Sequence, residues 1–127
     1  MEQKTFFIEG QVPAQKNAKK SFINRRTGKP FIMTDPKVKA WQEDASKQLV
    51  EAHITPFKGV VGVSAIFYHK DKRKRDIDNE LASIMDLLKN NGIIEDDNCF
   101  IVPDIHIVFG GVSDTPGAKI TITPLTP

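Results

Sequence analysis

Residues 59–79 read GVVGVSAIFYHKDKRKRDIDN. Over Gly59–Tyr68, apolar side chains occupy both alternating sets of positions, which predicts a strand buried on much of both faces. The basic run His69–Arg75 follows, and it ends in four consecutive Lys or Arg residues. Asp76 and Asp78 come next, where an apolar helical pattern begins. The stretch therefore predicts a strand that leads, through a basic loop, into a helix.

The predicted helix runs from Asp76–Asp78 to about Asn90. Its apolar stripe recurs at i, i+4, i+7 and i+11 and consists of Ile77, Leu81, Ile84 and Leu88. Asn91-Gly92 ends the helix, because these residues tolerate a left-handed backbone. An acidic loop, Glu95–Asn98, precedes a second predicted strand over Phe100–Phe109. This order is a strand–helix–strand crossover.

The remaining elements lie on either side of this crossover. Before it we expect a strand (Thr5–Ile8), a basic loop (Gln11–Lys20), a hairpin (Ser21–Ile23 with Pro30–Met33) and a helix capped by Thr34 or Asp35 that ends near His53; after it we expect a loop at Gly110-Gly111 and a last strand (Ala118–Thr123). We predict one domain over residues 1–127, of the α/β (α+β) class, with a small mixed sheet and two main helices.

Composition limits the cellular setting. The chain has 127 residues, 39% of them hydrophobic and 27% charged, which is typical of one globular domain. The single Cys99 cannot form an internal disulfide and fits a reducing compartment. No apolar run approaches the roughly 18 residues that span a bilayer. We therefore expect a cytoplasmic protein without a membrane partner.

Charge is divided unevenly along the chain. Residues 1–75 carry 16 of the 18 Lys and Arg residues but only seven of the 16 acidic residues. The formal net charge of +2 is thus the near-cancellation of a basic part and an acidic part that meet at the Arg75–Asp76 peptide bond. Such asymmetry favours a surface for a polyanion beside an acidic centre with another role.

Asp76 and Asp78 form the candidate metal site. Residues i and i+2 of an extended backbone share a face, so both carboxylates can point to one spot. Carboxylates without Cys or His partners suit Mg²⁺ or Mn²⁺, and the basic run would hold flanking phosphates. The alternative is structural: one Asp caps the helix, the other favours its dipole, and the protein is a DNA-binding module without catalysis.

Asp97 is a third candidate ligand whose position depends on strand direction. If the two central strands are parallel, the acidic loop begins the second strand at the end far from Asp76. If they are antiparallel, or if the loop curls back along the helix, Asp97 joins the pair. The residues alone leave both arrangements open.

The motif resembles the RusA family of Holliday-junction resolvases, which are small phage- and prophage-associated endonucleases. The resemblance rests on Arg75-Asp76-Ile77-Asp78-Asn79, the apolar helix, Asn91-Gly92-Ile93-Ile94 and Asp96-Asp97. A weaker match is Pro13-Ala14-Gln15-Lys16-Asn17, after the first strand. The resemblance implies a Mg²⁺-dependent homodimer, with Mn²⁺ as a possible substitute, that cuts paired strands of a four-way DNA junction in a bacterial or phage-infected cell.

The resemblance also implies that Asp76, Asp78 and Asp97 bind the metal together. The residues expected at DNA are Lys16, Asn17, Lys19, Lys20, Lys72, Arg73, Lys74, Arg75 and Asn79. One departure is Ala82, where the family often has a Lys, and it keeps the non-catalytic alternative open. A nuclease for other branched DNA is a third interpretation. Phe22 and Phe31, in the basic hairpin, are candidates for an aromatic wedge, and the scattered histidines argue against a zinc site.

Overall fold

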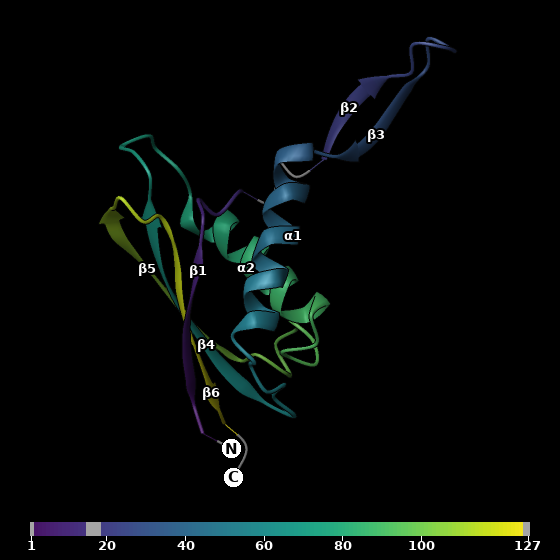
Figure 1. Ribbon diagram of the computed structural model, residues 1–127. Helices are drawn as coiled ribbons and strands as arrows, with labels where there is room; N and C mark the ends of the chain where they lie inside the picture. The colour runs from purple at the N-terminus through teal and green to yellow at the C-terminus, as the bar shows by residue number, and fades with distance from the viewer. Residues whose placement is uncertain (1, 15–18, 126–127) are drawn as a thin grey trace.

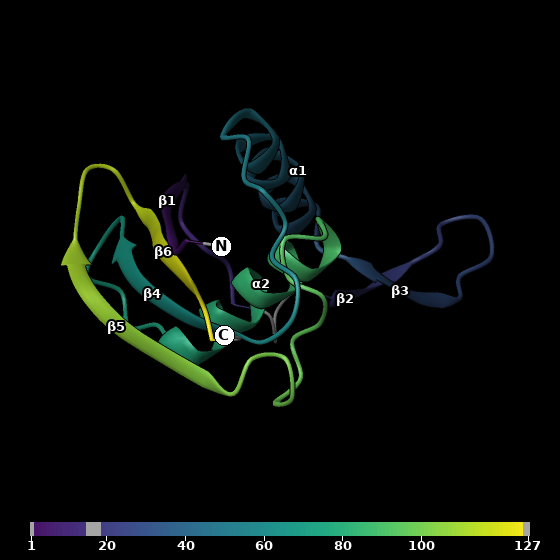
Figure 2. The same ribbon diagram turned by 90° about the horizontal axis from the view of Figure 1, so that it is seen from below.

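The computed structural model describes residues 2–14 and 19–125. Its elements are β1 (Lys4–Glu9), β2 (Lys19–Ile23), β3 (Pro30–Thr34), α1 (Pro36–Glu51), β4 (Val61–His69), α2 (Ile77–Asn90), β5 (Asp104–Val112) and β6 (Gly117–Pro124). Four strands form a sheet in the order β1-β6-β4-β5, and β2 and β3 form a separate two-stranded hairpin. Both helices lie on the same face of the four-stranded sheet (Figures 1 and 2). The predicted fold class is confirmed.

β4 is the strand on which the sheet is organised. It pairs in parallel with β5 on one side and antiparallel with β6 on the other. One set of its side chains belongs to the core and is buried: Val61, Val63, Ala65 and Phe67. The alternate set is only half-buried: Ser64, Ile66 and Tyr68. The prediction of a strand buried on both faces is thus correct for the helix-covered face and too strong for the other.

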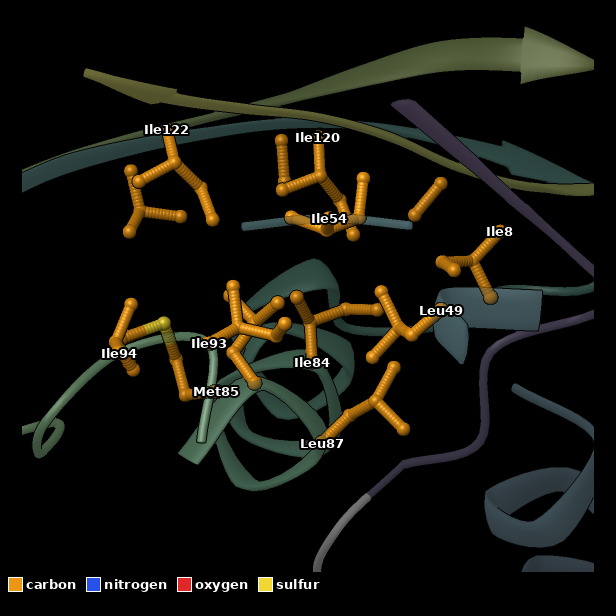
Figure 3. Packing of buried hydrophobic residues seen from close by; sticks show 14 of the residues in the cluster. Ile8, Leu49, Ile54, Ile84, Met85, Leu87, Ile93, Ile94, Ile120 and Ile122 are labelled. Atoms are coloured by element: carbon orange, nitrogen blue, oxygen red, sulfur yellow. The ribbon is translucent and has the colours of Figure 1, made fainter. Parts of the chain in front are cut away.

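The core lies between α2, α1 and the sheet (Figure 3). Ile84 and Leu88, from the predicted stripe of α2, have no exposed surface. They belong to the same buried cluster as Ile120 and Ile122 of β6 and Leu49 of α1. Burial of this kind removes apolar area from water and is the main favourable contribution to folding. The packing of α2 in this core also fixes where its first turn lies relative to β4.

α1 begins as the sequence predicts. Asp35 is its N-cap, and one carboxylate oxygen accepts a hydrogen bond from the backbone N–H of Lys37 at 2.9 Å. Pro36 occupies the first helical position, where its missing N–H costs nothing. Within the described residues, neither helix is long and apolar enough to cross a membrane.

β5 begins four residues later than predicted and continues through the glycines that were expected to form a loop. Asn98 is the reason for the late start, because its side-chain oxygen accepts from the backbone N–H of Phe100 at 2.9 Å and forms a turn there. Gly110 stays in the strand because β5 passes close to β4 at this point. A Cβ on Gly110 would lie 2.6 Å from the ring of Tyr68, so only glycine fits.

Candidate functional site

Asp76 is the N-cap of α2, but its side chain makes no capping hydrogen bond. Its backbone is extended, at φ −100° and ψ 115°, and its carboxylate is exposed. Asn79 Nδ2 lies 3.4 Å from Asp76 Oδ2 and donates to it. By contrast, the side chain of Asp35 at the start of α1 does accept a capping hydrogen bond. The structural alternative, in which Asp76 serves as a cap, is therefore wrong for this side chain.

Asp78 lies in the first turn of α2 and is also exposed. Because Ile77 is already helical, the extended backbone on which the expectation of a shared face rested is absent between the two aspartates. The Asp78 side chain makes no hydrogen bond or ion pair with any residue in 2–14 or 19–125. Two exposed carboxylates with room for water and phosphate oxygens are the ligand set that Mg²⁺ uses. The pair therefore fits a hard divalent cation.

Asp97 lies at the opposite end of α2. Because β4 and β5 are parallel, the 14-residue helix separates Asp97 from Asp76 and Asp78 by roughly 20 Å at 1.5 Å per residue. Lys89 Nζ, in the last turn, is 3.4 Å from Asp96 Oδ1 and 3.9 Å from Asp97 Oδ1. The backbone N–H of Asp97, assisted by Lys89, lowers the pKa of Asp96.

The three aspartates therefore do not meet within one chain. Across residues 2–14 and 19–125, no three His, Cys, Asp or Glu side chains are grouped to hold a metal. The antiparallel arrangement left open by the sequence is excluded. The expectation that Asp97 joins the pair is not met within a single copy, because a parallel crossover places the start of β5 at the far edge of the sheet.

The basic loop presents some of its charges to solvent and uses one internally. Lys72, Arg73 and Lys74 are exposed. Arg75 is 16% exposed, and its Nη1 donates to Asp71 Oδ1 at 2.7 Å. This bond, with the backbone N–H of Arg73, lowers the pKa of Asp71 to about 2. Arg75 therefore shapes the loop, while the three preceding side chains are available to an anion.

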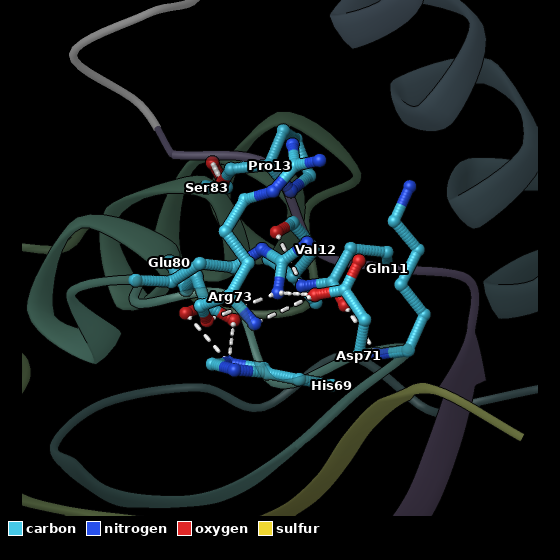
Figure 4. A network of polar contacts seen from close by, with 10 residues as sticks. Gln11, Val12, Pro13, His69, Asp71, Arg73, Glu80 and Ser83 are labelled. Atoms are coloured by element: carbon cyan, nitrogen blue, oxygen red, sulfur yellow. Dashed lines mark hydrogen bonds and ion pairs between the residues drawn. The ribbon is translucent and has the colours of Figure 1, made fainter. Parts of the chain in front are cut away.

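His69 and Glu80 form a buried pair that no sequence pattern predicts (Figure 4). His69 Nε2 is 2.8 Å from Glu80 Oε1, and the residues are 3% and 1% exposed. Burial raises the pKa of Glu80, and the neighbouring His69 opposes that shift. His69 ends β4 and Glu80 lies in the first turn of α2. The pair thus ties the helix start that carries Asp76 and Asp78 to the central strand.

Residues that follow β1 are hydrogen-bonded to the basic loop and to α2. Gln11 Oε1 accepts from the backbone N–H of Lys70 at 2.9 Å, and Ser83 Oγ donates to the carbonyl of Pro13 at 2.6 Å (Figure 4). The segment predicted to be a DNA-binding loop therefore reaches the start of α2. Lys16 and Asn17 lie outside the described residues, and the backbone of Lys19 and Lys20 belongs to β2 instead of a loop.

A cavity of about 640 Å³ lies beside Asp76. Its walls come from the chain after β1, the first half of α1 and the basic loop, and its charged lining includes Lys37, Lys70, Arg73, Lys74 and Arg75. Asn79 and Trp41 also line it, and Trp41 Nε1 is buried without a hydrogen-bond partner in the described chain. The volume is within the range of roughly 300–1,000 Å³ typical of ligand pockets.

These features define a class of protein. The α/β domain has two aspartates that do not cap α2, and they lie next to a cationic loop and a cavity lined by Lys and Arg. Such a surface is suited to bind a phosphate backbone next to a divalent ion.

Comparison with known proteins names the family. The family model described as endodeoxyribonuclease RusA matches residues 10–123. A curated crossover junction endodeoxyribonuclease RusA from Aquifex aeolicus (strain VF5) is 32% identical over 108 residues, which cover 81% of this chain and 79% of the relative. This chain belongs to the RusA family of endodeoxyribonucleases.

Proposed function

We propose that this chain is a Mg²⁺-dependent endodeoxyribonuclease that resolves four-way DNA junctions by paired cuts and works in the cytoplasm as a homodimer. The observation that carries the proposal concerns Asp76, which is the N-cap of α2 but makes no side-chain capping bond, and which precedes the exposed Asp78 by two residues. An exposed carboxylate that does not cap its helix can serve as a cation ligand. The family match supplies DNA as the polyanion.

Each group in the site has a distinct task under this proposal. Asp76 and Asp78 would hold the metal, and the chemistry it would supply there is activation of a water and stabilisation of the leaving oxygen of the phosphodiester. Lys72, Arg73 and Lys74 hold phosphates flanking the cut, because exposed cations beside a groove position the backbone without reading sequence. The buried contact between His69 and Glu80 keeps the aspartate pair in place as DNA binds.

The position of Asp97, taken as a metal ligand, supports the proposal of a homodimer. About 20 Å separates Asp97 from the pair in one chain, so it reaches a pair only in a second copy. A two-fold axis would then build two equivalent sites, as two symmetric cuts require. Edge strand β5 offers a surface for such pairing, since Ile105, Val108, Phe109 and Val112 are 41–55% exposed.

Cleavage of a labelled synthetic four-way junction tests the proposal. We expect paired nicks with Mg²⁺, none in EDTA, and little cutting of the matching linear duplex. A protein that binds the junction but nicks it with neither Mg²⁺ nor Mn²⁺ would instead be the non-catalytic module that Ala82 keeps open. Equal cutting of flaps, forks and duplex would indicate a nuclease for other DNA structures.

The salt dependence of binding tests the role of the basic loop. Substituting Lys72, Arg73 and Lys74 by Ala should reduce the slope of log K against log salt by about one unit for each phosphate that is no longer neutralised. Fluorescence anisotropy of a labelled junction in EDTA measures it. Lys58→Ala is the matched control, because Lys58 is exposed but precedes β4 at the other edge of the sheet. An unchanged slope in the triple variant would mean that the loop does not touch DNA.

A further inference from the structure

The hairpin formed by β2 and β3 extends away from the rest of the molecule as an arm, beyond the start of α1 (Figures 1 and 2). Its two strands pair only with each other and form their own sheet. A two-stranded ribbon on its own cannot bury both of its faces. The side chains that the arm leaves exposed therefore indicate what it contacts.

The arm exposes large apolar side chains. Phe22 and Phe31 are directly opposite in register, with ring centroids 5.9 Å apart and planes 29° apart, so they stack on one face. Ile23 and Ile32 lie on the other face and are 70% and 73% exposed. The phenylalanines proposed as a wedge from the sequence are thus engaged with each other, and the two isoleucines are the more accessible.

The tip of the arm is cationic. Between Gly10 and Thr34 the chain contains six Lys or Arg residues and no acidic residue. The turn that joins β2 to β3 is ordered, since Asn24 Oδ1 accepts from the backbone N–H of Arg26 at 2.9 Å. Arg25, Arg26 and Lys29 are exposed in this turn, and none forms an ion pair with a residue that the structure describes.

The exposed aliphatic groups and the cations of the turn together identify the partner. Proteins that kink DNA insert apolar side chains between base pairs, while Lys and Arg hold the adjacent phosphates. A second copy of the arm fits less well, because arms without acidic residues repel each other. Insertion costs least where stacking is already interrupted, and the branch point of a junction is such a place.

We propose that the β2–β3 arm inserts Ile23 and Ile32 against unstacked bases at the branch point, while Arg25, Arg26 and Lys29 hold the neighbouring phosphates. The arm thereby makes binding selective for branched over linear DNA. The stacked phenylalanines stiffen the arm from the opposite face. This inference rests on the proposed function, because it requires that the protein act on branched DNA.

The test uses the full chain with Ile23→Thr and Ile32→Thr combined. Threonine is β-branched and suits a strand, and both positions are exposed, so the fold is kept. The probe is a four-way junction with 2-aminopurine at the branch point, titrated in EDTA. We expect wild type to raise the fluorescence and the double variant to lose that rise. Junction affinity should fall about tenfold with duplex affinity unchanged.

Val50→Thr is the matched control, since Val50 is 69% exposed on α1 and lies outside the arm. The inference is overturned if the double variant keeps both the fluorescence rise and the junction preference. It is also overturned if the substitutions change only the oligomeric state, measured by sedimentation, because the arm then contacts a second copy. A wild type that binds the junction and gives the rise without ever nicking it with Mg²⁺ contradicts the proposed function alone.

Discussion

Asp78→Asn should abolish Mg²⁺-dependent cleavage of a four-way junction while leaving binding intact in EDTA. The substitution keeps the size of the side chain and removes the charge that would hold the cation. A bound metal supplies several kcal/mol of transition-state stabilisation, and each 1.36 kcal/mol is tenfold in rate, so we expect a loss on the order of 10³-fold. Because the Asp78 side chain is exposed and makes no hydrogen bond or ion pair with a described residue, the fold should not change.

Asp44→Asn is the control for charge alone. Asp44 is an exposed aspartate on α1 whose carboxylate accepts from Gln48 Nε2, a bond that asparagine can keep. Rates from single-turnover cleavage and affinities from anisotropy separate chemistry from binding. The assigned role of Asp78 is contradicted if Asp78→Asn cuts at the wild-type rate, or if its loss of cleavage is matched by a loss of junction binding in EDTA.

Two inactive chains should restore each other's activity when they form a mixed dimer. Asp78→Asn removes a ligand from the pair, and Asp97→Asn removes the carboxylate that reaches the pair from the other copy. In the heterodimer, one site combines an intact Asp78 with an intact Asp97, and the other site carries both substitutions. We therefore expect nicking to return, with single nicks instead of paired cuts.

Two different affinity tags on the chains allow the heterodimer to be isolated and assayed on a labelled junction. The same tags on two wild-type chains provide the control for dimer exchange. If the wild-type hybrid cuts and the mixed hybrid does not, Asp97 does not complete the site of a second copy. Asp97 would then have to act at the pair of its own chain, although the length of α2 separates the two by roughly 20 Å.

The parts of the fold that the sequence predicts are governed by local rules. The stripe of α2 follows from the helical period, and the start of α1 follows from Asp35 and Pro36. The location of Asp76 and Asp78 at a strand-to-helix junction is local in the same way. These features need only neighbouring residues, and the structure bears them out.

The parts that the sequence does not settle depend on contacts between distant segments. Whether β5 runs parallel to β4 decides where Asp97 lies, and no residue near Asp97 carries that information. The pairing of His69 with Glu80 spans the basic loop, so neither residue alone signals it. The start of β5 is displaced because Asn98 forms a turn where alternation suggests a strand. Sequence reasoning therefore locates the acidic pair but not the elements that complete and support it.

The proposed cleavage depends above all on Asp76 and Asp78 binding the divalent cation. Anomalous diffraction from crystals of the full chain soaked with Mn²⁺ locates that cation without reference to activity. We expect a peak bound by oxygens of both Asp76 and Asp78, with Asp97 of a second copy beside it. A peak held only by Asp96 and Asp97, at the far end of α2, would contradict this assignment. So would crystals with no ion at the pair, if the same protein shows full Mn²⁺-dependent cleavage in solution.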